Sequence, residues 1–483
     1  MVAGRWIAFA GLLLLLARGG LLLSREPCLG VADNRDYWRV ARPAGIDARP
    51  PVRKGVFVVC TYVAGESRLA TSFSSPALLA VVSRRFDWGF DVPRDRFDLR
   101  QLGLLYWVAA AALLAGCVIA RLPVLLALFF AWVVIDPGFL LFFNSLYADP
   151  ALILGILATV CLLPVSRLGE PRDAGRSPPR TVLALLLLAA ALAGFSKMQY
   201  APFPLVMLAC WGLALGIRRQ RPAAFEAMFL GLLALLAVLA PMHFLKGAAP
   251  RFLEVNNYNA VYGGIAKVAS HPSRTLARLG IPEEYRSLPA KDFFALDVEQ
   301  RDDPVLSHLG NLSRVRLAWQ YLRDPRALAG AAERIELELW KSRTHPRGTR
   351  VREESRRRDS VFRTPEQFSR FRGYLLAVLP PRALWLFLVV MIAALGARAW
   401  RGTWSSLDTA SLFLLAWLVA QCAVTVLGDG FVSLHQHLLG ARLAFDLLLV
   451  LLASRGLSFL AGRLVRATPH FMKEGRQGRS WLL

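Results

Sequence analysis

Long apolar runs recur along the chain from its first residues almost to its end. Several extend over about 18 residues or more, the length of helix that crosses the hydrocarbon core of a bilayer. The runs are continuous, whereas the strands of a transmembrane barrel alternate between apolar and polar residues. We therefore predict an all-α polytopic membrane protein of about ten transmembrane helices. The predicted spans are residues 6–23, 102–120, 122–143, 149–165, 181–196, 201–217, 223–245, 378–397, 408–427 and 437–454.

The first run has the position of a signal peptide, and this alternative has to be weighed. Arg18 interrupts the run, Leu21-Leu22-Leu23 continues it beyond that charge, and no clear small-residue cleavage site follows. We therefore favour a retained first helix.

Basic residues gather in the short segments between alternate spans. The formal net charge is +24, yet the short turns 144–150 and 428–436 contain no Lys or Arg. This positive-inside pattern favours an even number of spans with both termini in the cytoplasm. The charge is therefore mainly a topology signal and does not indicate nucleic-acid binding. The predicted inside residues are Arg5, Arg121, Arg167, Arg172, Arg176, Arg180, Arg218, Arg219, Arg221, Arg398, Arg401, Arg455, Arg463, Arg466, Lys473, Arg476 and Arg479.

Two long segments, residues 24–101 and 246–377, then fall outside, because long segments are translocated largely regardless of their charge. We expect both to contain membrane-surface helices, and residues 76–82 predict one that is too short to span. The resulting regions are an N-terminal membrane module with the first outside loop, a second outside segment, C-terminal transmembrane helices and a basic cytoplasmic tail. Their bounds are 1–245, 246–377, 378–455 and 456–483.

Two features of the first outside loop concern its local structure. Residues 56–62 predict a short strand or a segment lying on the surface. Cys28 and Cys60 both lie in this loop, where an oxidising compartment would allow a disulfide. Two free thiols are an equally open interpretation, because the sequence does not give the distance between them.

Charged and aromatic residues appear as soon as the chain leaves the first span, in Asp33-Asn34-Arg35-Asp36-Tyr37-Trp38-Arg39-Val40. One interpretation is a polar loop, and the other is a catalytic carboxylate held at the membrane surface. Tyr37 and Trp38 suit an anchor at the lipid interface, where these side chains are enriched.

A polar turn follows the third span and is bracketed by Pro137 and Pro150. It contains Asn144, Tyr147 and Asp149. Placing an aspartate close to the bilayer costs free energy, so such a residue is by default a candidate for a functional role. Asp149 before Pro150 also fits the start of the next helix, so both interpretations stay open.

The turn Phe195-Ser196-Lys197-Met198-Gln199-Tyr200 carries a cation on the predicted outside, against the positive-inside trend. Lys197 could hold a lipid phosphate or sugar phosphate, or its ammonium could reach up to the lipid headgroups.

The last predicted outside turn, Gly428-Asp429-Gly430, leads to His435 and His437. Arg442 and Asp446 follow in the next span, four residues apart and hence on one helix face. In a purely structural role, Arg442 and Asp446 would pair with each other. Arg442 nevertheless lies near the outer end of the span and could face a phosphate.

The candidate residues converge on one side of the membrane. A carboxylate there can deprotonate an acceptor hydroxyl while Lys or Arg stabilises a departing phosphate. The chain has no phosphate-binding Gly-Lys-Ser/Thr loop, dinucleotide fingerprint or His-Glu-x-x-His metal motif, so we assign no metal ligands and no cofactor. The converging residues are Asp33, Asp36, Asp136, Asp149, Lys197, Asp429, His437 and Arg442.

The order of these features resembles the GT-C class of integral-membrane glycosyltransferases, which use polyprenyl-phosphate sugars. Asp36 looks like the first-loop catalytic aspartate, with Asp33 as the second choice, and residues 144–150 look like the second-loop acidic motif. The turns at Ser196-Lys197-Met198-Gln199 and Gly428-Asp429-Gly430 with His437 are similar to turns in bacterial members. The first loop lacks the Asp-Glu pair of many members, which leaves the choice of base open.

The resemblance implies transfer of a hexose or pentose from a polyprenyl-phosphate carrier to a glycan, lipid or protein acceptor. The expected location is the periplasmic face of the bacterial inner membrane, with the bilayer and the lipid-linked donor as partners. Asp36 would deprotonate the acceptor, and Lys197 and Arg442 would hold the carrier phosphate. Asp149 and Asp429 would assist. The remaining binding candidates are His437, Asn144, Tyr147 and Gln199.

Two alternatives belong to other functional classes. A transporter or flippase for lipid-linked glycans would place charges deep within several spans and show internal repeats, and the sequence shows neither clearly. A non-catalytic membrane subunit of a polysaccharide assembly system would leave the acidic residues as ordinary loop residues.

Overall fold

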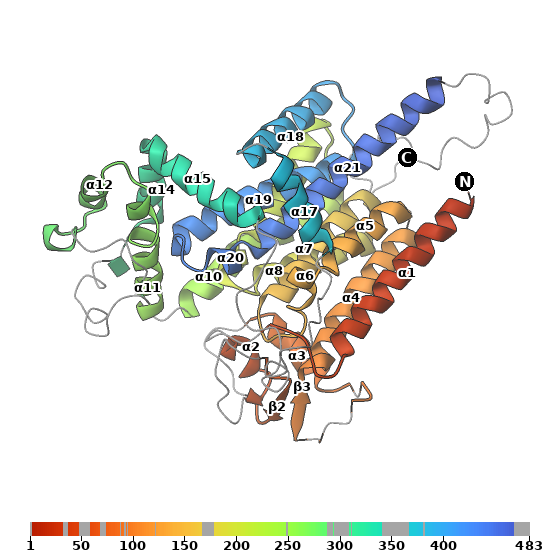
Figure 1. Ribbon diagram of the computed structural model, residues 1–483, viewed down its shortest axis with the longest axis horizontal. Helices are drawn as coiled ribbons and strands as arrows, with labels where there is room; N and C mark the ends of the chain where they lie inside the picture. The colour runs from red at the N-terminus through yellow and green to blue at the C-terminus, as the bar shows by residue number, and fades with distance from the viewer. Residues whose placement is uncertain are drawn as a thin grey trace.

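Helices make up most of the molecule, as the apolar runs predict (Figure 1). Six described helices are long and apolar enough to cross a membrane, and three shorter apolar helices accompany them. The protein is therefore a polytopic helical membrane protein, while the number of ten spans stays a prediction. The computed structural model describes residues 2–31, 37–47, 58–67, 74–86, 88–90, 93, 95–120, 122–166, 178–247, 250–286, 293, 309–310, 312–340, 367–379 and 382–467.

The helices fall into two groups by length. The longer ones are α1 (Val2–Ser24), α4 (Leu99–Ile119), α5 (Val124–Val134), α7 (Asp149–Val165), α8 (Arg180–Gly194), α9 (Phe203–Ile217), α10 (Ala224–Gly247), α11 (Pro250–Val261), α14 (Arg314–Arg323), α15 (Pro325–Trp340), α17 (Gln367–Val378), α18 (Ala383–Trp400), α19 (Ser406–Asp429) and α21 (Leu439–Ala467). The shorter ones are α2 (Trp38–Ala41), α3 (Pro76–Ser83), α6 (Pro137–Leu140), α12 (Pro272–Arg278), α20 (Leu434–His437) and the single turns η1 (Met198–Tyr200), η2 (Ile265–Lys267) and η3 (Glu283–Tyr285).

The centre of the bundle is formed by α7, α19 and α21, which pack against one another. Small residues allow this close approach: Gly440 of α21 lies directly against Leu152 of α7 and the Trp417 indole of α19. By contrast, α10 and α18 keep large apolar side chains such as Leu235 and Val389 exposed. Exposed apolar faces on helices of this length are expected where hydrocarbon surrounds the bundle.

A small antiparallel sheet in the first predicted outside loop corrects the purely helical prediction. The strands β1 (Ile46–Asp47), β2 (Thr61–Ala64) and β3 (Arg96–Asp98) pair in that order, with Thr61 opposite Asp98. β2 begins within the predicted apolar segment 56–62, of which residues 56 and 57 lie outside the described residues. Residues 76–82 form a helix as predicted, and α3 packs against α2 and α4.

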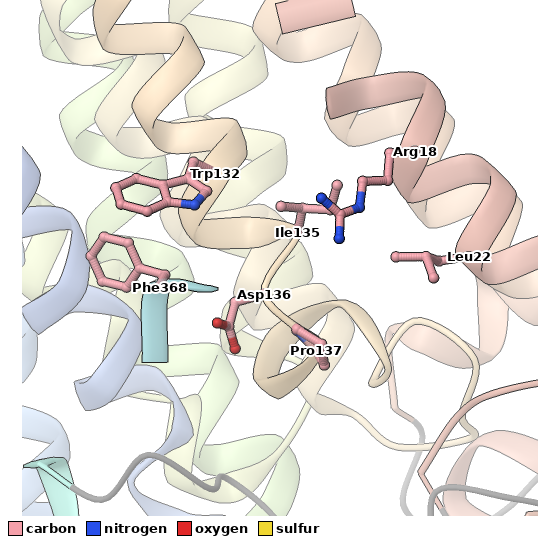
Figure 2. Close-up of a pocket in the computed structure, with 7 residues that line it drawn as sticks. All are labelled: Arg18, Leu22, Trp132, Ile135, Asp136, Pro137 and Phe368. Carbon is pink, nitrogen blue, oxygen red and sulfur yellow. The ribbon is translucent and has the colours of Figure 1, made fainter. Parts of the chain in front are cut away.

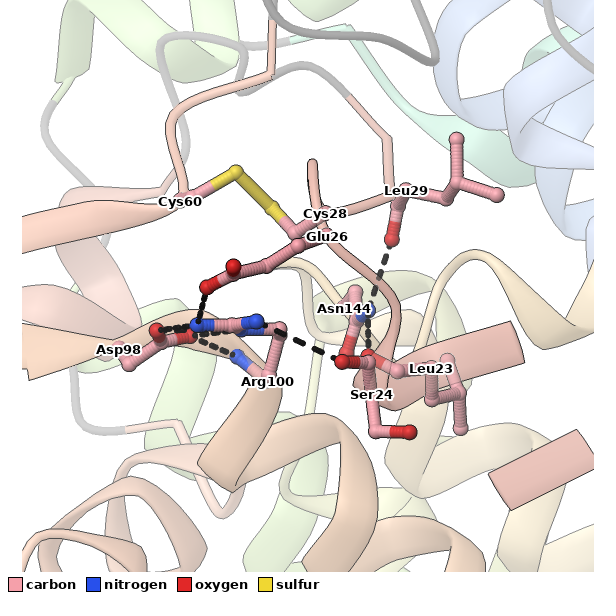
Figure 3. Close-up of a disulfide and its surroundings, with 9 residues drawn as sticks. All are labelled: Leu23, Ser24, Glu26, Cys28, Leu29, Cys60, Asp98, Arg100 and Asn144. Carbon is pink, nitrogen blue, oxygen red and sulfur yellow. Dashed lines mark hydrogen bonds and ion pairs between the residues drawn. A yellow bond between two sulfur atoms is a disulfide. The ribbon is translucent and has the colours of Figure 1, made fainter. Parts of the chain in front are cut away.

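A disulfide between Cys28 and Cys60 resolves the open question about these cysteines, with their Cα atoms 6.0 Å apart (Figure 3). Beside it, the Arg100 guanidinium forms ion pairs with Asp98 at 2.7 Å and with Glu26 at 3.0 Å. Together these bonds hold the end of α1 to the sheet and to the start of α4.

Three of the basic residues that were predicted to lie inside make contacts that the structure describes. The Asp408 carboxylate at the start of α19 pairs with Arg398 at 2.9 Å and with Arg455 at 2.8 Å. The Arg180 guanidinium lies 3.9 Å from the centroid of the Phe225 ring, which places the starts of α8 and α10 side by side. The side of the membrane that these residues face stays a prediction.

Candidate active site

Three segments that are far apart in the sequence meet at one recess. α2 provides Arg39 and Val40. The turn before α7 provides Tyr147 and Ala148, and α7 begins with Asp149. The turn after α8 provides Ser196 and Lys197. Each segment belongs to a stretch that the sequence singled out, so the fold brings parts of all three together.

The two first-loop aspartates, Asp33 and Asp36, lie outside the described residues. Their neighbours are described: Tyr37 precedes α2, and the Arg39 and Arg42 guanidinium carbons lie 5.7 and 5.4 Å from the centroid of the Trp38 ring. Because Arg39 lines the recess, the chain between Asp36 and the recess is only three residues long. Three residues span at most about 10 Å.

Asp149 is the first residue of α7, and only 2% of it is exposed. Its side chain does not cap the helix; the N-cap position belongs to Ala148. A carboxylate in the first turn is nevertheless favourable, because it lies near the positive end of the helix dipole. The Tyr200 hydroxyl donates a hydrogen bond to the Asp149 Oδ1 atom, so this buried charge has a protein partner.

Lys197 lies between α8 and η1 in extended backbone, with φ of −157°. Its ammonium lies 5.8 Å from the centroid of the Tyr200 ring, a favourable cation–π separation. The neighbouring Ser196 is buried, and its carbonyl accepts a hydrogen bond from the Ser74 hydroxyl at 2.5 Å. The segment before α3 therefore fixes the turn that presents Lys197 to the recess.

A second polar group starts from the same turn. Gln199 Nε2 lies 2.6 Å from His437 Nδ1, and His437 Nε2 lies 3.0 Å from Asp429 Oδ2. The Asn259 amide donates to Asp429 Oδ1 at 2.7 Å. The side chains of His437 and Asp429 are each 16% exposed, so both reach the protein surface. Three predicted residues are thus joined in one hydrogen-bonded chain.

Arg314, at the start of α14, adds a cation beside this second group. Its guanidinium donates to the Leu427 carbonyl at 2.5 Å. Burial lowers the pKa of Arg314 to about 10, and the nearby Asp429 carboxylate acts in the opposite direction. The predicted second outside segment therefore contacts the end of α19 directly before the turn at Gly428-Asp429-Gly430.

η1 links the two groups, because its consecutive residues point to different partners. Gln199 reaches His437 of α20, and Tyr200 reaches Asp149 of α7. The arrangement places two carboxylates, one lysine and one histidine around a single short turn. Such a set can accept a proton from a hydroxyl and stabilise an anion.

Asn144 and Arg442 lie elsewhere. Asn144 is fully buried, and its amide donates to the carbonyls of Leu23 at 2.9 Å and Leu29 at 2.7 Å (Figure 3). This side chain therefore fastens the turn before α7 to the end of α1.

Arg442 is fully buried and donates to the Glu338 carbonyl at 2.9 Å, so its guanidinium is directed into α15 rather than toward the recess. The predicted pairing of Arg442 with Asp446 is wrong. Asp446 instead forms an ion pair with Arg372 of α17 at 2.6 Å. Spacing along α21 could not reveal this partner, because α17 packs there from a distant part of the chain.

Sequence reasoning missed several residues of the two groups. Arg39 and Tyr200 stand within quoted stretches but were not assigned to the site, and Asn259 belongs to the run Asn256-Asn257-Tyr258-Asn259. This run of three asparagines and one tyrosine was the sequence signal that could have indicated a polar site there. Arg314 had no signal beyond its charge.

In the part of the chain that the structure describes, no group of three or more His, Cys, Asp or Glu side chains gathers that could hold a metal ion. Comparison with known families matches residues 8–473 to the family described as the YfdI N-terminal transmembrane domain. No curated protein matches the chain, and no solved structure matches it. The family description agrees with the helical membrane architecture.

Proposed function

The chain belongs to the YfdI N-terminal transmembrane domain family, and we propose that it is a membrane glycosyltransferase. The donor would be a sugar on a polyprenyl-phosphate carrier, and the acceptor a cell-envelope glycan, lipid or protein. The reaction would take place on the periplasmic face of the bacterial inner membrane, with both chain termini in the cytoplasm. No cofactor beyond the lipid-linked donor enters this proposal.

The recess between α2, α7 and η1 is the observation that carries the proposal. It combines the neighbours of Asp36 with a cation, Lys197, and a buried carboxylate, Asp149. Transfer of a sugar from a phosphate requires a base for the acceptor hydroxyl and a positive charge for the leaving phosphate. The recess supplies the cation, Lys197, and a carboxylate, Asp149, and the proposed base Asp36 stands three residues before Arg39 in the sequence.

The proposal assigns each residue a role. Asp36, or Asp33 as the alternative, deprotonates the acceptor hydroxyl, and Lys197 stabilises the phosphate that leaves. Asp149 orients the site together with Tyr200, while Gln199, His437 and Asp429 form the hydrogen-bonded group that η1 links to it. We leave Arg442 and Asn144 out of this site, since both are buried against other parts of the fold.

Substitution of the proposed base tests the assignment. Asp36→Asn keeps the size of the side chain and removes the proton acceptor, so we expect glycan product to fall by about 100-fold or more. Glycan profiling of cells that make equal amounts of each protein measures the effect. Asp95→Asn is the matched control, because Asp95 is an exposed aspartate in the same loop. Unchanged product from Asp36→Asn at normal protein level would refute the role of Asp36.

Translocation of lipid-linked sugars is a second candidate function, favoured by one observation. Arg372, Arg442 and Asp446 are fully buried between helices, as the charges of a transport path would be. Arg372 and Asp446 neutralise each other directly, however, which suits a structural ion pair. Movement of a lipid-linked sugar across vesicles that contain the purified protein, without any sugar transfer, would favour this function.

A further inference from the structure

Arg18 is a cation within an apolar helix. It lies in the candidate span Trp6–Ser24, six residues before the end of α1, which corresponds to about 9 Å along the helix. A charge at this depth is costly unless it meets an opposite charge, and its partner is therefore informative. Among the residues that the structure describes, the Arg18 guanidinium has neither an ion pair nor a hydrogen bond.

The side chain of Arg18 reaches into a narrow recess, open to the outside of the bundle, between α1, α5 and α17 (Figure 2). Most of the lining is apolar, and the Trp132 and Phe368 rings form one wall, in edge-to-face contact with centroids 5.1 Å apart. The rest of the lining is Leu22, Ile135, Pro137 and the carboxylate of Asp136.

Among the described residues, Asp136 is the second charged group that lines this recess, and both of its oxygens accept hydrogen bonds from other groups. Oδ1 accepts hydrogen bonds from the Gly138 amide at 3.0 Å and the Ser369 hydroxyl at 2.9 Å, and Oδ2 accepts from the Ser369 amide at 2.9 Å. Figure 2 shows its carboxylate turned toward Phe368 and α17, whereas Arg18 enters from α1 on the other side. Asp136 thus fastens α17 to the start of α6, and in the described structure it forms no ion pair with Arg18.

We infer that the Arg18 recess binds the phosphate of a membrane lipid, with the first part of the lipid chain against the apolar wall. A guanidinium donates two parallel hydrogen bonds to phosphate oxygens, which makes arginine well suited to this group. A lipid supplies both the anion and the hydrocarbon that this lining accommodates. The phosphate belongs either to a bilayer phospholipid or to a polyprenyl phosphate, and the site stands whether or not the protein transfers sugars.

Lipid binding by the purified full-length protein tests this inference. Native mass spectrometry in mild detergent would measure the retention of added phosphatidylglycerol, undecaprenyl phosphate and uncharged diacylglycerol. We expect the wild type to retain at least one of the two phosphate lipids in preference to diacylglycerol. Arg18→Gln should weaken that binding by about tenfold or more, since it removes a charged hydrogen-bond donor. Whichever phosphate lipid binds more tightly identifies the source of the phosphate.

Three further variants separate binding from folding. Lys246→Gln is the matched control, an exposed cation at the end of α10 that should leave lipid retention unchanged. Arg18→Lys keeps the positive charge but removes the bidentate hydrogen bonding of the guanidinium. It should therefore bind the phosphate lipid with intermediate affinity. Leu22→Trp leaves Arg18 in place and fills the recess, so it should also weaken binding, even if Arg18→Gln does not fold. Wild-type retention by a folded Arg18→Gln, equal retention of diacylglycerol, or full competition by inorganic phosphate would overturn the inference.

Discussion

The Asp149 carboxylate and the Tyr200 hydroxyl are a buried polar pair within the helix bundle. Asp149 is 2% exposed, and Tyr200 is fully buried. A buried charge of this kind depends on its hydrogen bonds, because water cannot replace a lost partner. Tyr200 therefore stabilises the carboxylate and at the same time holds η1 beside the recess.

Removal of this hydroxyl should destabilise the protein. Tyr200→Phe leaves the ring in place but leaves Asp149 without its donor, so we expect the free energy of unfolding to fall by about 1 to 3 kcal/mol. Thermal unfolding in detergent measures the change. Tyr374→Phe is the control, because Tyr374 is 73% exposed and should be neutral. An unfolding temperature equal to that of the wild type would mean that the pair contributes nothing to stability.

The predicted first outside loop is stabilised by a covalent bond, the disulfide between Cys28 and Cys60. Its strands are two to four residues long, so the sheet itself buries little apolar area. The disulfide between Cys28 and Cys60 joins positions 32 residues apart and fixes the entry to β2 beside the end of α1. The loop carries α2 and hence one wall of the recess, so its stability bears on the site.

Loss of the disulfide should loosen this loop. We expect Cys28→Ser/Cys60→Ser to lower the free energy of unfolding by about 3 kcal/mol, because the unfolded chain regains the entropy of an open loop. The measurement is thermal unfolding, together with proteolysis of the loop in intact membranes. Reduction of the wild type should reproduce the effect, and Cys210→Ser, which changes a free cysteine elsewhere, should not increase loop cleavage. Equal protection of the loop with and without the disulfide would contradict this expectation.

At the scale of the whole molecule, α18 lies on the opposite side of the bundle from the small sheet and α2 (Figure 1). Arg398 of α18 and Arg455 of α21 pair with Asp408 at the start of α19, whereas α2 contributes to the recess. Helices that cross a bilayer place their two ends in different compartments. The basic loops predict that the Asp408 end faces the cytoplasm.

Chemical labelling of introduced cysteines checks this orientation. Glu66 and Arg401 are both exposed, the first beside β2 and the second after α18. We expect a membrane-impermeant maleimide to label Glu66→Cys in cells with an opened outer envelope, and Arg401→Cys only after the inner membrane is also permeabilised. The native free cysteines Cys117, Cys161, Cys210 and Cys422 are buried, so the unaltered protein provides the background. Labelling of both positions from one side would refute the two-sided arrangement.

The sequence alone determined the helical membrane architecture, because continuous apolar length is a local property that reports directly on burial in lipid. It also identified the three stretches that meet at the recess, since polar residues at the ends of apolar runs stand out without any tertiary information. Lys197 and Asp149 were recognised for this reason. The sequence did not predict that the short strands pair into a sheet, because strands of two to four residues show little alternation of apolar and polar positions.

Only the tertiary structure decided which polar residues meet. Asp446 pairs with Arg372 rather than with its neighbour Arg442, and Asn144 turns toward the backbone of α1 rather than toward a ligand. In each case the partner comes from a part of the chain more than 70 residues away. Helix spacing shows which residues share a face, but only the packing of distant helices determines what that face meets.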